Sequence, residues 1–275
     1  MKSSGFTLIE LVIVILIIAI LAAMSTQLIT LPVKSYIDLK HRTTLVDTAD
    51  TSLRRMQRDI RRALPNSIRV NSSGTMLELL HTSDGGRYRA STANNSSVST
   101  SPCGTVADAI LNFTTTDDCF EIMGSLSTFD STKTHSEFLY IYNTDVATAY
   151  IDINDPSSNR RQLTKSDNDS SITFTKLTKP FPASSPEQHF FIVDTPITYY
   201  CELSTQQLWR YHGYDIQPTQ APPPDVNKQL QANKITGCKF IYTSNTLTRS
   251  GLVTLTITLD NTVTLMHQIH VDNVP

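Results

Sequence analysis

The feature that most restricts the fold of this chain is an apolar run close to its start. Residues 11–24 are all aliphatic, alanine or methionine. With the residues just before it, the run approaches the roughly 20 apolar residues that span a bilayer as a helix. One acid, Glu10, lies near its head. A charge in mid-membrane costs about 2.5–3.5 kcal/mol on insertion scales, so an acid here indicates a partner or a function.

Three ordinary explanations of this segment compete. A secretory signal needs a small-residue cleavage site after its apolar part. Residues 21–25, LAAMS, offer a poor one, and the charge of Glu10 does not suit such a core. A lipoprotein signal requires a cysteine at the end of the run, whereas the first cysteine is Cys103. A plain membrane anchor fits by length, but it leaves the Gly5-Phe6 junction and Glu10 unexplained.

The residues GFTLIE at positions 5–10, followed by the apolar run, resemble the processing and assembly signal of type IV pilins and type II secretion pseudopilins. In that family a prepilin peptidase cuts after the glycine, and the new N-terminal phenylalanine is N-methylated. The resemblance implies cleavage between Gly5 and Phe6 and methylation of Phe6. It also implies that Glu10 offers its charge to the terminal amine of a neighbouring subunit, which offsets the cost of burying both ions.

A second helical pattern follows. Residues 33–64 contain neither glycine nor proline, and Pro65 ends the pattern. An apolar stripe at spacings of three and four residues is typical of one helix face, and it consists of Val46, Ala49, Leu53, Met56, Ile60 and Ala63. We expect one helix over residues 6–64 whose second half docks on a β domain; a two-helix coiled coil is the alternative. Many pilins have a proline at the position of Gln27, so we expect any unwinding in a filament around residues 30–33, near Pro32.

Beyond the helix the apolar pattern has a period of two, which indicates strands. Residues 253–259, the turn Asp260-Asn261 and residues 263–271 predict a C-terminal hairpin, and residues 197–201 and 208–211 predict another. Further strands are expected over residues 76–80, 138–142, 149–153, 172–177 and 189–193, with exposed loops over 91–101 and 217–225. The predicted fold class is α+β, a long N-terminal helix packed on a mainly antiparallel β-sheet.

Four cysteines lie in the body of the chain, and sequence neighbours favour the pairs Cys103–Cys119 and Cys201–Cys238 among the possible connectivities. The sequence contains no CxxC pair that would indicate a zinc site. Disulfides persist in oxidising compartments such as the bacterial periplasm. The basic residues argue for the opposite orientation, because one precedes the membrane segment and three follow it. We adopt a periplasmic domain, since the cysteines and the resemblance agree.

The expected organisation is a leader peptide (residues 1–5), a transmembrane helix half (6–32), an amphipathic helix half (33–65) and a periplasmic β-rich globular domain (66–275). The last has the length for two sheets. The net charge of −2 provides no basic field for nucleic acid.

Later stretches resemble particular members of the superfamily. Residues 53–63, LRRMQRDIRRA, look like the helix end of J-type pseudopilins, and residues 199–211 and 267–275 look like MshO-type minor pilins of the MSHA pilus system. This resemblance implies a minor pilin that initiates or assembles a type IV pilus. Its partners would be prepilin peptidase, other minor and major pilins, and the inner membrane before assembly. Residues 71–135 match no pattern of this family.

The sequence contains no catalytic constellation and neither an HExxH motif nor a serine elbow. The histidines considered as ligands are dispersed: His81, His135, His189, His212, His267 and His270. Three acidic stretches, 117–118, 152–155 and 167–169, have residues that could bind calcium, but they lack EF-hand spacing and are expected to be turns. One aromatic group has the residue types of a sugar-stacking face, although core packing is the expectation: Tyr199, Tyr200, Trp209, Tyr211 and Tyr214.

We therefore expect a structural subunit of the pilus rather than an enzyme, without cofactor or metal. Two alternatives stay open. One is a bitopic inner-membrane protein with a periplasmic binding domain, and the other is a pilus-tip adhesin whose loop 91–101 binds a glycan.

Overall fold

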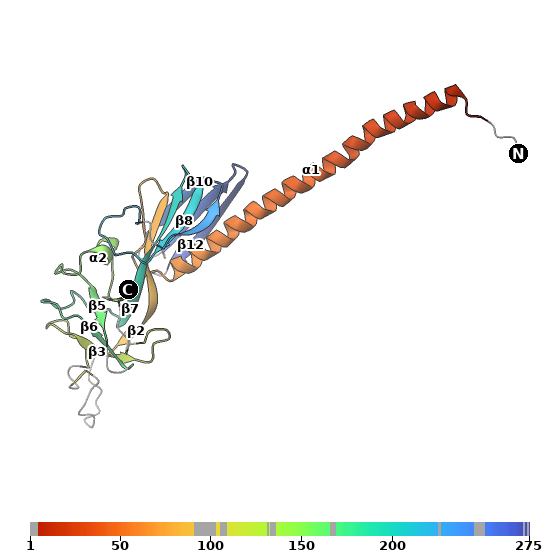
Figure 1. The fold of residues 1–275 in the computed structure, drawn as a ribbon. Helices are drawn as coiled ribbons and strands as arrows, with labels where there is room; N and C mark the ends of the chain where they lie inside the picture. Colours follow the sequence, from red (N-terminus) through yellow and green to blue (C-terminus); the bar gives the residue numbers. More distant parts are fainter. Residues whose placement is uncertain are drawn as a thin grey trace. The chain divides into compact units, whose positions relative to one another are not determined.

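The computed structural model describes residues 5–90, 103–104, 109–130, 132, 136–165, 169–224, 227–244, 251–271, 273 and 275, except for the side chains of residues 26–29. The chain divides into two compact units, Met1–Asp47 and Thr48–Pro275. The first unit consists of the N-terminal part of helix α1 (Leu8–Arg61). The second contains the last turns of that helix, a short helix α2 (Val146–Tyr150) and the strands (Figure 1).

Helix α1 continues through Pro32, and residues 30–33 are helical. Unwinding of this part in a filament stays a prediction. In the second unit the expected docking is confirmed, because Ala49, Leu53, Met56 and Ile60 are all buried by the chain's own domain. The stripe therefore needs no second helix to cover it.

The helix ends at Arg61 rather than at Leu64 because the next residues pair with a strand. The amide of Leu64 donates to the carbonyl of Leu80 at 2.8 Å, and the amide of Thr82 donates to the carbonyl of Arg62 at 2.8 Å. These backbone groups are thus taken by the sheet, and they leave none for another helical turn.

Within the described residues, nine strands form one sheet in the order β1-β2-β3-β6-β5-β4-β7-β8-β9, and all of its pairings are antiparallel. The strands are β1 (Arg69–Val70), β2 (Met76–Tyr88), β3 (Cys119–Met123), β4 (Phe138–Ile141), β5 (Arg160–Thr164), β6 (Ser171–Phe174), β7 (His189–Glu202), β8 (Gln207–His212) and β9 (Gln229–Asn233). A separate three-stranded sheet contains β10 (Ile235–Thr243), β11 (Gly251–Leu259) and β12 (Val263–Val271). The fold class is α+β, as predicted.

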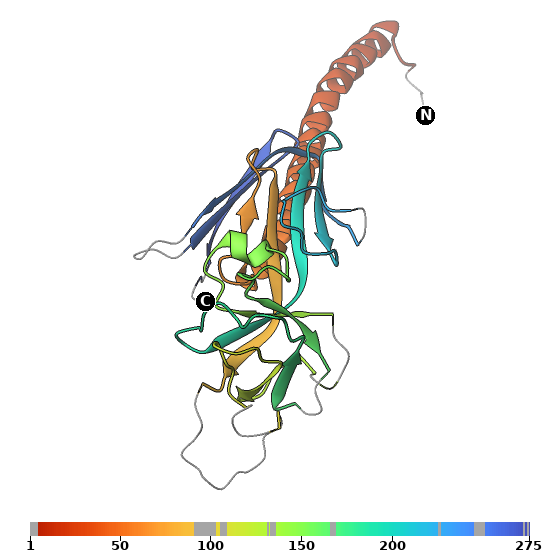
Figure 2. The same cartoon turned by 90° about the vertical axis from the view of Figure 1, so that its left-hand side faces the viewer.

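Six strands of the large sheet close into a ring, because β2 pairs with β7 as well as with β3. The path β2-β3-β6-β5-β4-β7 thereby returns to β2. Closure removes sheet edges, and side chains fill the interior of so small a barrel. The interior combines aliphatic side chains with five aromatic ones in one buried cluster: Tyr88, Phe120, Phe174, Phe181 and Phe190. Figure 2 shows this barrel as a lobe below the lobe that contains the last turns of α1.

Strands β2 and β7 run through both lobes. Residues 76–81 of β2 pair with residues 195–200 in the helix-bearing lobe, and residues 82–87 pair with residues 189–193 in the barrel. The register shifts twice between His81 and Asp84, where the strands pass from one lobe to the other. The strands predicted over residues 76–80 and 189–193 are therefore parts of two much longer strands.

Both predicted hairpins are confirmed. Strands β11 and β12 pair with Leu259 opposite Val263, and strands β7 and β8 pair with Cys201 opposite Leu208. The strand predicted over residues 149–153 is wrong, since Val146–Tyr150 form α2. The carboxylate of its N-cap residue, Asp145, accepts a hydrogen bond from the next turn of the helix at 2.9 Å, which favours a helix start over a strand. The predicted loop is irregular over residues 217–224, and loop 91–101 lies outside the described residues.

Candidate functional site

The first unit places the residues expected to be processed at the start of α1. Gly5 and Phe6 lie just before the helix, and the side chain of Phe6 is 74% exposed. Glu10 is in the first helical turn, where its amide donates to the carbonyl of Thr7 at 3.2 Å. The helix dipole favours an acid at this end. That local effect explains an acid in the first turn but not an acid in a membrane-spanning run.

The apolar run of α1 is bare on every side. Its large apolar side chains from Leu8 to Met24 are between 43% and 81% exposed. Within the described residues, α1 is the one helix long and apolar enough to cross a membrane. Each such side chain left in water forgoes about 1.5–3 kcal/mol of burial. The segment therefore requires lipid or other helices around it.

Glu10 is the only ionisable side chain between residues 6 and 33, and it is exposed on this bare helix. A carboxylate accepts strong, charge-assisted hydrogen bonds from an ammonium group. In surroundings without water such a partner decides whether the charge is tolerated. This segment can therefore associate with other apolar surfaces, and its Glu10 carboxylate can form one ionic contact.

In the second unit, α1 is fixed by a polar network that the sequence pattern does not predict. Asp59, which lies off the apolar stripe, accepts hydrogen bonds from Arg210 Nε at 2.7 Å and from the Tyr199 hydroxyl at 2.8 Å. Its side chain and that of Arg210 are 14% and 12% exposed. Ser52 Oγ donates to the carbonyl of Gln231 at 2.9 Å. These contacts join the helix to β7, β8 and β9.

A second ion pair lies inside the same lobe. Arg69 Nε contacts Glu78 Oε2 at 2.8 Å, and the Tyr214 hydroxyl donates to Glu78 Oε1 at 3.2 Å. The guanidinium of Arg69 lies 3.6 Å from the centre of the Tyr150 ring. Burial raises the pKa of Glu78, and the hydrogen bond and charge of Arg69 oppose that rise. This pair supports the fold.

The aromatic residues considered for sugar stacking are mainly structural. Tyr199 and Tyr211 are buried, and the hydroxyl of Tyr214 is engaged by Glu78 and Thr198. Burial, which outweighs the other effects, raises the pKa of Tyr214, so its hydroxyl stays neutral. The expectation of core packing is confirmed for Tyr199 and Tyr211.

The two disulfides follow the pairing that chain order favours. Cys103 is joined to Cys119 at the start of β3, and Cys201 of β7 is joined to Cys238 of β10. The second bond connects the nine-stranded sheet to the three-stranded sheet. A covalent link between the two sheets restricts the unfolded chain most effectively when the closed loop is long.

The acidic stretches serve as turn residues wherever they are described. Asp117 accepts hydrogen bonds from the amides of Asn112 and Asp118, and Asp155 accepts one from the amide of Ser157. Burial raises the pKa of Asp117. The described residues contain no group of three or more His, Cys, Asp or Glu side chains placed to hold a metal. His135 and residues 167–168 lie outside the described part.

Comparison with known proteins gives one match. Residues 1–26 match the model of the prokaryotic N-terminal methylation motif. No curated protein and no solved structure matches the chain. The match covers the segment that contains Gly5, Phe6 and Glu10, and it ends within the bare helix.

Proposed function

We propose that this protein is a minor pilin or pseudopilin. It is made as a precursor, cut by prepilin peptidase between Gly5 and Phe6, N-methylated at Phe6 and then incorporated into a type IV pilus. One observation carries the proposal. The N-terminal methylation motif of residues 1–26 coincides with a bare, membrane-length helix whose sole charge before Lys34 is Glu10.

Gly5 gives independent support to a processing signal. Apart from the two neighbouring residues in the chain, no heavy atom of the described chain lies within 4 Å of the place where a β-carbon would stand at this residue. The folded chain therefore gives no steric reason for glycine here. An enzyme that must fit the backbone closely at the cut site supplies such a reason.

The physical course of assembly follows from the two properties of α1. Before assembly the apolar part lies in the inner membrane, and the β domain lies in the periplasm, where its two disulfides persist. After cleavage, the helix exchanges lipid for the helices of other pilins. Glu10 then contacts the methylated amine of Phe6 in a neighbouring subunit, so two charges leave water together.

The finer assignment is an MshO-like minor pilin of an MSHA-type pilus, with other minor and major pilins as partners. Residues 199–211 and 267–275 suggest the MshO-like type, and residues 53–63 suggest a J-type pseudopilin or a related minor pilin. Two of these stretches meet in the fold, because Asp59 of residues 53–63 contacts Tyr199 and Arg210 of residues 199–211.

Glu10→Ala in cells tests the assembly role. We expect normal cleavage of the precursor, because the cut site is intact, together with a strong loss of the subunit from sheared pili. Asp50→Ala is the matched control, since Asp50 is an acid on the same helix, paired with Arg54 and 45% exposed. Normal incorporation of the Glu10→Ala protein would contradict the proposed charge pairing.

A further inference from the structure

A cavity of about 760 Å³ lies between the end of α1, residues 82–87 of β2 and residues 189–191 of β7. Its volume is within the usual range for binding sites. All of its lining residues belong to the second unit. The cavity is thus a property of the folded β domain together with the last turns of α1.

The cavity lies where β2 has a strand partner on one side only. Residues 62–64 contact β2 on the side away from β7, and this contact ends at Thr82. Strand β3 pairs with β2 from Arg87 onwards. Within the described residues, the stretch 83–86 between these contacts has β7 as its only strand partner. The pair Gly85-Gly86 in this stretch carries no side chains, so bare backbone forms part of the lining.

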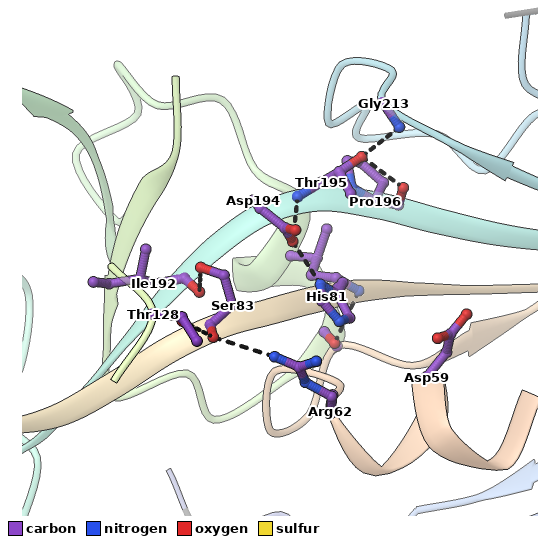
Figure 3. Close-up of polar contacts among 12 residues, drawn as sticks. Asp59, Arg62, His81, Ser83, Thr128, Ile192, Asp194, Thr195, Pro196 and Gly213 are labelled. Atoms are coloured by element: carbon purple, nitrogen blue, oxygen red, sulfur yellow. Dashed lines mark hydrogen bonds and ion pairs between the residues drawn. The ribbon is translucent and has the colours of Figure 1, made fainter. Parts of the chain in front are cut away.

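Three arginines from two elements line the cavity. Arg61 ends α1, Arg62 follows it directly, and Arg87 is on β2. All of them are exposed. Arg62 Nη2 donates to the carbonyl of Ser83 at 3.3 Å, as Figure 3 shows, and this bond uses only part of the donor capacity of the guanidinium. Within the described residues, neither Arg61 nor Arg62 forms an ion pair.

Structural roles explain only part of this positive charge. A helix dipole favours basic residues in the last turn, which accounts for Arg61 but not for Arg87 on the strand. Arg87 Nη2 contacts Glu187 Oε2 at 2.9 Å, and the two side chains are 52% and 60% exposed. Such a surface pair contributes little to stability. Arg87 can therefore exchange Glu187 for another carboxylate at little cost.

One carboxylate, Asp84, is also in the lining, but its oxygens are occupied by the protein itself. Oδ1 accepts a hydrogen bond from the amide of Gly85 at 2.8 Å, and Oδ2 accepts from the amides of Thr128 at 2.7 Å and Phe129 at 3.0 Å. The lining thus has three cations and one anion, in a chain whose net charge is −2. A local positive charge without an overall positive field suits a short acidic group better than a polyanion such as nucleic acid.

Apolar residues form another part of the lining. Pro65 and Phe190 are buried, whereas Ala63 and Phe191 are half-buried and can contact a ligand. Arginine and aromatic residues are enriched at protein interfaces, where a few side chains seated in pockets provide most of the binding energy. The cavity therefore combines an apolar wall with exposed cations that lack a buried counter-charge.

We propose that this cavity binds an acidic segment of a protein partner, in which an aromatic side chain is flanked by carboxylates. The aromatic ring of that segment lies against Ala63 and Phe191. Its carboxylates accept charge-assisted hydrogen bonds from Arg61, Arg62 and Arg87. Binding requires neither cleavage of the precursor nor incorporation into a pilus, so it holds or fails independently of the proposed function.

Calorimetric titration of the full chain in micelles of a non-ionic detergent tests this site. The probe is the peptide GDEFEDG with both ends blocked, and the comparisons are GDEAEDG, which lacks the aromatic ring, and GKKFKKG, which reverses the charge. We expect saturable binding of GDEFEDG and binding of both comparisons weaker by about tenfold or more. Absence of GDEFEDG binding, or equal binding of either comparison, would overturn the proposal.

Charge-reversal variants locate the site. Arg61→Glu and Arg87→Glu should each weaken GDEFEDG by about tenfold or more, and their unfolding midpoints should stay unchanged because both side chains are exposed. Arg54→Glu is the matched control. Arg54 is a 71% exposed arginine of the same helix, about 10 Å along the axis from Arg61 and so beyond the Debye length of about 8 Å. Unchanged binding in both test variants, or an equal loss in Arg54→Glu, would refute the assignment.

An oligothymidylate is a further comparison, because arginine binds phosphate as well as carboxylate. We expect it to bind less tightly than GDEFEDG at physiological ionic strength, since the chain lacks an overall positive field. Tighter binding of the oligonucleotide, lost in Arg61→Glu, would assign the cavity to nucleic acid and contradict the proposed acidic protein segment.

Discussion

Asp59 on the last turns of α1 and Arg210 on β8 meet at 2.7 Å, with only 14% and 12% of their side chains exposed. The contact joins residues far apart in the sequence. It also lies off the apolar stripe of the helix. The charged residues of this part of the helix are thus not all equivalent, because Asp59 forms a buried contact with the sheet while Arg54 pairs with Asp50 at the surface.

Asp59→Ala should lower the free energy of unfolding of the β domain by about 3 kcal/mol, because it leaves Arg210 and the Tyr199 hydroxyl without their acceptor in a site with little water. The measurement is urea unfolding of the full chain in micelles. Asp50→Ala removes an exposed pair and should change stability by less than about 1 kcal/mol. Equal losses of unfolding free energy in the two variants would show that the buried network stabilises the domain no more than the exposed pair does.

Removal of the disulfides should destabilise the domain in the order of loop length. The Cys201–Cys238 bond spans 37 residues and the Cys103–Cys119 bond spans 16. Chain entropy then predicts losses of about 4 and about 3 kcal/mol for the paired serine variants. Loss of the Cys201–Cys238 bond should affect the unfolding of both sheets together, since that bond joins them. Thermal unfolding of each variant measures the order, and a reversed order would contradict it.

Acid should release the loop at residues 127–129 through Asp84. Burial alone would raise the pKa of Asp84, but hydrogen bonds from the amides of Thr128, Gly85 and Phe129 outweigh it and lower the pKa below its usual 3.8. Its contribution to stability is therefore complete above pH 3.8 and is lost as the pH falls through the lower folded-state value.

Hydrogen exchange of those loop amides checks this prediction. Asp84→Asn should speed exchange relative to the unmodified protein at neutral pH, because the amide side chain lacks the charge that the loop amides bind. The difference between the two proteins should disappear at low pH, where Asp84 is protonated. A difference that is independent of pH would exclude the carboxylate as the cause.

The sequence predicts well those elements that have a simple period. Apolar residues recur every three or four positions in α1 and every second position in the β11–β12 hairpin. Asp260 and Asn261, in the turn of that hairpin, adopt the positive φ angles, 48° and 52°, that such a turn requires. The segment at residues 149–153 shows the limit. A few alternating apolar residues are compatible with strand or helix, and the cap at Asp145 decides for the helix.

Periodic patterns of this kind do not predict the barrel. Its strand β5 begins with Arg160 and Arg161, which read as surface residues but are buried. Ring closure depends on β2 and β7 running on through the register shifts between His81 and Asp84, a tertiary feature. The proposed processing site is the opposite case, because Gly5, Phe6 and Glu10 belong to a short linear motif that can be recognised without the fold.

Gly5→Val should block cleavage, because a β-branched side chain does not fit where the peptidase requires the bare backbone of glycine. The precursor should stay in the membrane fraction with the folded, disulfide-bonded domain intact. Gel mobility under non-reducing conditions and membrane fractionation measure both properties. Release of a mature-length chain from this variant would show that the cut lies elsewhere.

The N-terminal mass of the protein purified from its own cells shows whether it is processed as a pilin. We expect a chain that begins at Phe6 and carries one added methyl group on its amine. An intact chain beginning at Met1, or one cut after the apolar run, would contradict it and leave the segment as an ordinary anchor or secretory signal.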